Sequence, residues 1–335
     1  AVPAAAASTA AITVFLNSFV WQWRLGRPME LIRGLNGLTE RRRGSVVTIG
    51  TFDGVHLGHQ ALLESLAMHG RRLGRPAMVL TFEPMPREYL AAASCPARLT
   101  TFRERWRVFE RLGIEVLWLL RFAESLRTLS GEAFAQLLAQ RLRAPVVVVG
   151  HDFRFGRNGE ASAEMLRAAG EQLGFLTEIV PPVTLGGERV SSSAVRAALA
   201  AGQFAQAGRL LGRPYTMSGR VVRGEQLGRR LGYPTANLRL ERRRSPVDGI
   251  FAVRVHGIGA APLPAVASLG RRPTVGGGPM LLEVHVFDFS ANLYGRRIEV
   301  EFVAKLRDEA RFDDLEALVA QMHRDAEAAR TILKV

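Results

Sequence analysis

The hydrophobic pattern of this chain changes near residue 200, and this change constrains the fold more than any other feature. From Ser45 to about Ala200, short β-branched runs alternate with helix-length amphipathic segments. The runs that predict buried strands are 45–50, 77–82, 114–120 and 145–150, and the segments that predict helices are 57–70, 102–113 and 131–142. Such alternation is typical of a parallel sheet with crossover helices, so the first half is expected to be a doubly wound α/β domain.

After Ala200 the sequence predicts a different architecture. Residues 202–215 read as a short helix and a linker, and strand-length segments separated by Gly and Pro follow. These segments are 217–224, 249–257, 263–270, 281–289 and 296–306, and an amphipathic helix over 313–333 closes the chain. Short strands at regular spacing predict a small antiparallel barrel. We therefore expect an α/β domain over 29–200, a linker over 201–215 and a barrel domain over 216–335.

The first 28 residues fit neither domain. They have an apolar middle, but they lack a basic start, and Asn17 and Gln22 interrupt the apolar run well short of a membrane span. Residues 1–28 are expected to be a disordered or spurious extension upstream of a true start at Met29. A cleaved export signal is the alternative.

The charge and the cysteine content limit the classes of binding partner and the cellular compartment that fit this chain. The formal net charge is +14, and nearly all of the 45 basic residues are arginines scattered through every segment. Because they form no single stripe, anionic small molecules are favoured over nucleic acid. The single cysteine, Cys95, excludes an intrachain disulfide and fits a cytoplasmic protein. No membrane partner is predicted, and the sequence leaves open whether the chain forms a homo-oligomer.

The segment GTFDGVHLGHQ, residues 50–60, places two histidines at the start of a predicted helix. Helix N-termini bind anions, and His56 and His59 lie almost one turn apart on the same face. Gly58 leaves room for a nucleotide to approach the backbone. This arrangement favours attack on an α-phosphate with pyrophosphate as the leaving group. A solvated or packed histidine pair is the alternative, and Asp53 is the only nearby third candidate for a metal ligand.

Two later segments of the first half also carry polar side chains suited to a ligand. VVVGHDFRFG (147–156) ends a strand with Asp152 and Arg154, at the edge where open α/β sheets bind ligands. In VSSSAVR (190–196), the serines are candidates to cap a helix, and Arg196 follows about one turn later. This second helix N-terminus is a candidate to hold a triphosphate, and plain N-capping is the other reading.

Two rival classes of ATP-using enzyme are less consistent with the sequence. No Gly-Lys pair occurs, so a Walker-type phosphate loop is absent. A class I aminoacyl-tRNA synthetase would share the H-x-G-H signature, but it also needs a lysine-rich second signature. This chain has only two lysines, Lys305 and Lys334.

In the second half, the segment GRVVRGEQLGRRLGYPTANL (219–238) predicts a loop that wraps close to a ligand. Its glycines permit close approach and its arginines supply charge; they include Gly224, Gly228, Gly232, Arg229 and Arg230. The PTAN sequence places the Thr235 hydroxyl and the Asn237 amide beside a rigid proline, Pro234. Their oxygens are hard ligands, suited to a Mg²⁺ held mainly by ATP phosphates and water. An ordinary turn is the alternative.

Glu283 is the second clue in this half. It lies in an otherwise apolar strand, LLEVHVFDF, on the opposite face from Leu282, Val284 and Val286. A carboxylate there either faces solvent or faces a ligand cavity, where it would act as general base toward a hydroxyl nucleophile. His285 shares its face and is a weaker candidate.

Together these segments resemble the bacterial bifunctional riboflavin kinase/FAD synthetase family. The resemblance covers essentially all of residues 29–335, and its motifs occur in the family's order. They are MELIRGL, GTFDGVHLGHQ, TFEPMPREYL, VVVGHDFRFG, VSSSAVR, GRRLGYPTANL, SLGRRPTV, LLEVHVFDFSANLYG and LRDEARFDDLEALVAQMHRD.

The resemblance implies an H-x-G-H nucleotidyltransferase domain of Rossmann-like fold that adenylylates FMN to FAD. His56 and His59 would then bind and stabilise the ATP phosphates, and Arg196 would assist them. The nucleotide-binding set implied for this half is Gly50, Phe52, Asp53, Gly54, Gly58 and Ser192. TFEPMPREYL, Asp152 and Phe153 would border the flavin.

For the second half the resemblance implies a flavokinase barrel that phosphorylates riboflavin to FMN. Thr235 and Asn237 would hold magnesium and ATP, and Glu283 would activate the ribityl 5′-hydroxyl. The remaining ligand-binding set implied here is Gly228, Arg229, Gly232, Pro234 and Arg307. The substrates and products would be ATP, riboflavin, FMN and FAD.

The chain departs from the family pattern at three places. Ser268 and Asn292 stand where the family usually has Asn and Asp, and the RNGE loop after Gly156 is two residues shorter. The loop belongs to the transferase half, so a kinase with an impaired transferase is one alternative. A flavin- or nucleotide-binding regulator is another, against which the retained His56, His59 and Glu283 argue.

Overall fold

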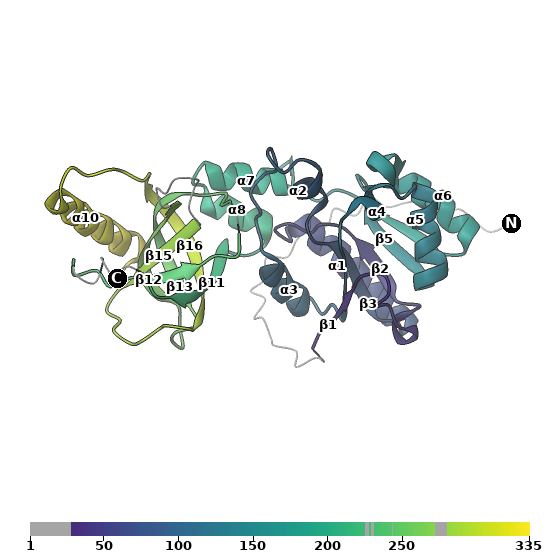
Figure 1. The fold of residues 1–335 in the computed structure, drawn as a ribbon, viewed down its shortest axis with the longest axis horizontal. Helices are drawn as coiled ribbons and strands as arrows, with labels where there is room; N and C mark the ends of the chain where they lie inside the picture. Colours follow the sequence, from purple (N-terminus) through teal and green to yellow (C-terminus); the bar gives the residue numbers. More distant parts are fainter. Residues whose placement is uncertain (1–27, 225–227, 229–230, 243, 272–279) are drawn as a thin grey trace.

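The computed structural model describes residues 28–224, 228, 231–242, 244–271 and 280–335. Figure 1 shows two bodies joined by a pair of helices: a parallel sheet with its helices on the right and a β-barrel on the left. The extension expected over residues 1–28 lies outside the described residues apart from Pro28. Both expected architectures, the α/β half and the barrel, are confirmed.

The first half contains a six-stranded parallel sheet in the order β1-β4-β3-β2-β5-β8. Its strands are β1 (Glu30–Arg33), β2 (Val46–Ile49), β3 (Ala77–Phe82), β4 (Val116–Leu120), β5 (Val146–Gly150) and β8 (Leu176–Val180). The four strands that the sequence predicts are the four central ones. The two edge strands, β1 and β8, escaped prediction because each is short and mixes polar with apolar residues.

Helices cover both faces of this sheet, as a doubly wound fold requires. The core on one face includes Leu63 and Leu66 of α1, and the core on the other includes Phe134 of α5 and Leu166 of α6. The helices are α1 (Leu57–Leu73), α2 (Pro86–Leu90), α3 (Phe102–Arg111), α4 (Glu124–Arg127), α5 (Gly131–Gln136) and α6 (Ala163–Leu173). The helix predicted over 131–142 continues from α5 as a π-helical turn, Leu137–Leu142.

Small elements fill the connections. They are the 3-10 helices Glu40–Arg42 and Arg157–Gly159 and the two-residue strands β6 (Arg154–Phe155), β7 (Ala161–Ser162), β9 (Thr184–Leu185) and β10 (Glu188–Arg189). The antiparallel pair β9 and β10 leads directly into α7.

The second half is a closed antiparallel barrel in the order β11-β12-β15-β14-β13-β16. Its strands are β11 (Thr216–Val222), β12 (Ala236–Arg239), β13 (Gly249–His256), β14 (Leu263–Arg271), β15 (Met280–Val286) and β16 (Arg297–Arg307). The predicted closing helix is α10 (Leu315–Leu333), which packs Ala326 and Ala329 against Phe287 and Ala252 of the barrel. The strand that sequence reasoning missed is β12, because PTAN reads locally as a turn.

Two linker helices, α7 (Ser192–Ala200) and α8 (Phe204–Leu211), join the halves. They do not form a loose connection. One continuous hydrophobic core contains Leu99 of the first half, Val195 and Leu210 of the linker helices, and Phe251 and Phe302 of the barrel. Burial of this shared apolar surface stabilises the arrangement of the two halves.

A buried polar cluster crosses the same boundary. The Glu104 carboxylate, on α3, accepts a hydrogen bond from the backbone N–H of Ser218 at 2.7 Å and is ion-paired with Arg242 at 2.6 Å. Arg242 also donates to the Tyr215 hydroxyl at 3.1 Å. Buried charges are stable only when they are paired in this way.

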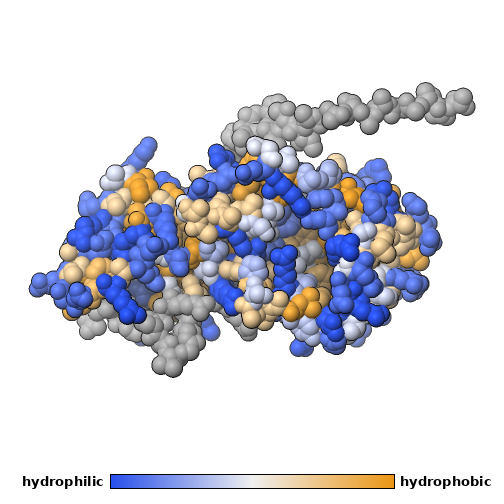
Figure 2. Space-filling view, turned by 90° about the horizontal axis from the view of Figure 1, so that it is seen from above, coloured by the Kyte–Doolittle hydropathy of each residue, from blue (hydrophilic) through white to orange (hydrophobic). Residues whose placement is uncertain are grey.

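The outer surface carries no large apolar face in the view of Figure 2, where hydrophobic residues occur in small groups among hydrophilic ones. Exposed large apolar side chains such as Met68, Leu90 and Met165 come from different elements. Within the described ranges, no helix is both long enough and apolar enough to cross a membrane.

Candidate functional site

A tight turn connects β2 to α1 and carries the two histidines. Helix α1 begins at Leu57, as predicted, with His56 as its N-cap. The backbone before it is strained, because Phe52 and Val55 have φ angles of 51° and 44°, which L residues rarely adopt. Gly54 has φ 85°, and its N–H donates to the Thr100 hydroxyl at 2.9 Å.

Asp53 joins this turn to the Leu99–Thr100 segment and to helix α7. Its carboxylate accepts hydrogen bonds from the N–H groups of Leu99 and Thr100, each at 3.0 Å, and is ion-paired with Arg196 of α7. The Ser192 hydroxyl donates to the Asp53 carbonyl at 2.8 Å. Asp53 and Ser192 thus fix the turn against α7. Ser191, not Ser192, is the N-cap of α7.

The two imidazoles are stacked, with ring centroids 3.7 Å apart and planes inclined by 20°. The Nδ1 of His56 accepts the His59 backbone N–H at 3.4 Å, which leaves Nε2 as the protonated nitrogen of a neutral ring. Burial lowers the pKa of His56 to about 4, and burial together with His56 holds the pKa of His59 well below its usual value. Both rings are therefore neutral near pH 7, where each can donate an N–H, as the sequence predicts, without carrying a positive charge.

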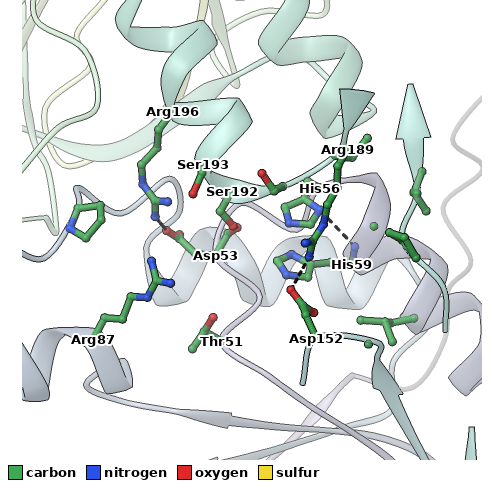
Figure 3. Close-up of a pocket in the computed structure, with 18 of the residues that line it drawn as sticks. Thr51, Asp53, His56, His59, Arg87, Asp152, Arg189, Ser192, Ser193 and Arg196 are labelled. Carbon is green, nitrogen blue, oxygen red and sulfur yellow. Dashed lines mark hydrogen bonds and ion pairs between the residues drawn. The ribbon is translucent and has the colours of Figure 1, made fainter. Parts of the chain in front are cut away.

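A cavity of about 470 Å³ opens in front of these residues. Figure 3 shows His56 and His59 beneath Arg189, and Asp53 between Arg196 and Ser192. The predicted residues that line the cavity are Asp53, His56, Gly58, His59, Asp152, Ser192 and Arg196. Residues far apart in sequence therefore meet at one site, at the carboxyl ends of β2 and β5.

Four predicted residues are not among those that line this cavity. Phe52 is 1% exposed and packs edge-on against His59 at 5.2 Å, so it supports the ring. Gly50 lies beneath Phe52, since an added Cβ would be 3.1 Å from its ring. Gly54 is buried in the turn, and Phe153 stacks on Phe155 at 5.5 Å. Phe52 and Gly54 are thus buried behind the cavity wall, whereas Phe153 is partly exposed.

Sequence reasoning missed several cationic side chains of the cavity. Arg189 of β10 is ion-paired with Asp152, and Arg87 of α2 points into the cavity opposite Arg196. Arg98 also lines the wall and is held by Glu83 and Glu88. Arg87 lies in TFEPMPREYL, the segment expected to border the flavin, but in a chain so rich in arginine no local signal distinguishes Arg98 or Arg189 from the rest.

The shortened loop after Gly156 lies away from this cavity. No residue between Gly156 and Glu160 is among those that line it, and Glu160 accepts the Gly131 N–H at 3.0 Å. The loop is thus bound to α5. Its length gives no structural reason for an impaired transferase.

The barrel has its own cavity, of about 330 Å³, beneath α10. Strand register brings three of its residues into one row: Asn237 of β12 pairs with Glu283 of β15, which pairs with Ser268 of β14. Glu283 is partly exposed and faces this cavity with Thr235, while Leu282 and Val284 are fully buried behind it. The predicted alternation is therefore confirmed, and the carboxylate lies beside the PTAN segment.

Asn237 has the features of a ligand to a hard cation. It is 6% exposed, and within the described part of the chain its Oδ1 has no hydrogen-bond partner. A Cβ added to Gly224 would lie 2.6 Å from this amide, so only glycine leaves it room. Because a buried oxygen without a donor is costly, the site fits an oxygen-seeking ion such as Mg²⁺.

The other predicted barrel residues divide between the cavity and its surroundings. Gly228 and Arg307 line it; Arg307 makes a two-pronged ion pair with Asp325 of α10, at 2.9 and 2.7 Å. Gly232 and Pro234 are exposed beside the cavity and do not line it. Arg229 lies outside the described residues.

The two halves match two different family models. The FAD synthetase model matches residues 38–194, and the riboflavin kinase model matches residues 211–333. A solved structure from Streptococcus pneumoniae, described as a macrolide-efflux protein, is 33% identical. It aligns over 91% of this chain and 99% of its own with a TM-score of 0.76.

Curated relatives match the whole arrangement. The bifunctional riboflavin kinase/FMN adenylyltransferase of Escherichia coli (strain K12) is 46% identical over 90% of this chain and 97% of its own length. The protein of the same name from Pseudomonas fluorescens is 45% identical over 91% and 98%. With both domains present in one chain and this identity over nearly its full length, the protein belongs to the family of bifunctional riboflavin kinase/FMN adenylyltransferases.

Proposed function

We propose that this chain catalyses two consecutive reactions: ATP-dependent phosphorylation of riboflavin to FMN in the barrel, and adenylylation of FMN to FAD in the α/β half. The observation that carries the proposal is the separation of two kinds of site. One cavity combines a helix N-terminus with neutral imidazole and arginine donors, and the other combines a carboxylate with hard oxygen ligands.

In the transferase half, the FMN phosphate is already an anionic nucleophile, so positioning and charge stabilisation suffice. His56 and His59 would donate N–H groups to the phosphates of ATP at the N-terminus of α1. The arginines of the cavity wall would offset the charge that develops on the departing pyrophosphate. Neutral imidazoles suit this role, because their donor nitrogens need no proton from solvent.

In the kinase half, the ribityl hydroxyl is a weak nucleophile, and Glu283 would accept its proton as it attacks the γ-phosphate. Thr235 and Asn237 would hold the ATP-bound Mg²⁺ from one side. The ion would neutralise phosphate charge. Arg307, fixed by Asp325, would border the flavin.

The chemistry implies small-molecule partners only, namely ATP, Mg²⁺ and the three flavins. We place the reactions in the cytoplasm, since the single cysteine, Cys95, is suited to a reducing compartment.

Incubation of the purified chain with riboflavin, ATP and Mg²⁺, followed by chromatographic separation of the flavins, tests the proposal. FMN should appear first and FAD second, with pyrophosphate released in the second step. FMN without FAD would restrict the function to the kinase half. The absence of both products would refute the proposal.

A further inference from the structure

The turn that carries the histidines needs external support. Two of its residues other than glycine, Phe52 and Val55, have positive φ, and a β-branched side chain such as valine is least suited to it. A backbone held in this region persists only when surrounding contacts impose it. Those contacts therefore decide where His56 and His59 lie.

Arg213, which follows the linker helix α8, supplies two of these contacts. Its guanidinium donates to the carbonyl of Gly54 at 2.7 Å and to that of Val55 at 3.1 Å. It also donates to the carbonyl of Leu211, the last residue of α8, at 3.2 Å. Every acceptor that the described residues offer to this guanidinium is a backbone carbonyl. The side chain thus bridges the end of the linker helix and the active-site turn.

Gln60 of α1 makes a second bridge between the same elements. Its side-chain amide donates to the Val55 carbonyl at 2.9 Å and to the Leu211 carbonyl at 2.8 Å. The helix ends approach closely here, because a Cβ added to Gly212 would lie 2.7 Å from the side chain of Leu57. Arg213 and Gln60 therefore share the Val55 carbonyl and act on one unit of backbone.

Arg213 also places a positive charge near the two histidines. Burial lowers its pKa to about 10, which still leaves it protonated at neutral pH. Its positive charge is one of the causes that lower the pKa of both histidines. It thus helps to keep the imidazoles neutral as well as to hold the turn.

We propose that Arg213, assisted by Gln60, is a positioning residue for the adenylyl transfer: it holds the 52–56 turn so that the imidazoles face the phosphates of ATP. This inference rests on the proposed transferase function. Arg213 lies between the linker helix and the first barrel strand, so the segment leading into the kinase half sets the geometry of the other half's site.

The test is the Arg213→Ala variant of the full chain, assayed for both reactions separately. We expect kcat for FAD formation from FMN to fall about 10- to 100-fold, since small misplacements of catalytic groups have effects of this size. FMN formation from riboflavin should stay within about twofold. Arg213→Lys should restore only part of the loss, because an ammonium lacks the fork that reaches two carbonyls.

Arg209→Ala is the matched control. Arg209 is an exposed arginine of α8 that donates only to Gln206 among the described residues, so both activities should be unchanged. An unchanged transferase kcat in Arg213→Ala would overturn the inference. So would an equal fall of both activities in a chain that remains folded by circular dichroism.

If Arg213→Ala does not fold, Gln60→Ala decides. A lowered transferase kcat with normal FMN formation supports the inference, and a normal transferase kcat overturns it. In folded chains the double variant should lose less than the product of the single losses, because both side chains act on the Val55 carbonyl. Failure of the unaltered chain to make FAD would instead refute the proposed function itself.

Discussion

The carboxylate of Glu104, on α3, is ion-paired at 2.6 Å with Arg242, which follows β12 in the other half of the chain. Both side chains are almost fully buried. The same carboxylate accepts the backbone N–H of Ser218 and that of Thr101, so its three contacts reach both halves. The boundary between the two enzymatic halves is thus a specific polar contact inside a shared apolar core.

Replacement of Glu104 by Ala should lower the free energy of unfolding by about 3–5 kcal/mol, because it leaves the Arg242 guanidinium buried without its carboxylate. Urea unfolding measures the loss. Glu110→Ala, at an exposed position of the same helix, should change stability by less than about 0.5 kcal/mol. Equal effects of the two substitutions would show that the buried ion pair contributes no more to the free energy of unfolding than an exposed carboxylate does.

Replacement of Glu283 by Ala should abolish FMN formation and leave FAD formation from supplied FMN intact. The reason is that the kinase reaction requires a proton acceptor at the ribityl hydroxyl, whereas the transferase reaction does not. Separate assays of the two steps measure this. Asp288→Ala, an exposed carboxylate just beyond the end of the same strand, is the control and should leave both rates unchanged. Loss of both activities in Glu283→Ala would contradict the division of labour.

Combined replacement of His56 and His59 by Ala should give the reverse pattern, loss of FAD formation with normal FMN formation. The rings would no longer donate to the ATP phosphates, and removal of a preorganised donor typically lowers kcat about 100- to 1000-fold. His69→Ala is the matched control: His69 lies near the other end of α1 and contacts Glu178. A double variant that still makes FAD at the normal rate would remove the histidines from the mechanism.

The stability of the chain should fall as the pH decreases from about 6.5 to 4. The pKa of His56 is about 4 in the folded chain against 6.5 as its ordinary value, so the unfolded chain binds more protons in this window. The protonation of His56 therefore has no effect on the free energy of unfolding above pH 6.5. It lowers this free energy as the pH falls, by about 3 kcal/mol at pH 4. Urea unfolding over this range should show a smaller pH slope in His56→Ala.

His256 provides a control of opposite sign. Its hydrogen bond to Glu301 raises its pKa, so its contribution is present below pH 6.5 and is lost as the pH rises through the folded-state value. The substitution His256→Ala should leave the slope between pH 4 and 6.5 unchanged and should remove a decrease in stability above pH 6.5. A slope that His56→Ala leaves unchanged would show that His56 titrates normally in the folded chain.

Sequence patterns predicted the elements whose signal is local. The runs at β2 and β5 are mostly β-branched, those at β3 and β4 are mostly apolar, and all four are buried over most of their length, so their sequence pattern and their burial agree. Strand β12 was missed because its pairing with β11 and β15 is made by distant residues, while Pro234 gives its start the appearance of a turn. Here tertiary contacts override the local preference.

For the candidate sites too, the sequence predicted some residues and not others. Motifs singled out His56, His59, Thr235, Asn237 and Glu283. For the last three the local pattern alone left a turn or a solvent-facing carboxylate open, and only the order of the motifs along the chain favoured a site. The supporting role of Phe52 could not be predicted, because no local sequence pattern indicates that a phenylalanine adopts φ 51° and packs behind the His59 ring. Arg189 and Arg213 were not predicted, because their contacts with the site form only in the folded chain.

The Arg213 contacts to Gly54 and Val55 span 159 and 158 residues of the chain. During synthesis from the N-terminus, the histidine turn therefore emerges from the ribosome long before the guanidinium that steadies it. If Arg213 positions this turn as proposed, the α/β half attains its final active-site geometry only as translation reaches the start of the barrel. The barrel, translated last, performs the first chemical step, so the order of maturation runs opposite to the order of the reactions.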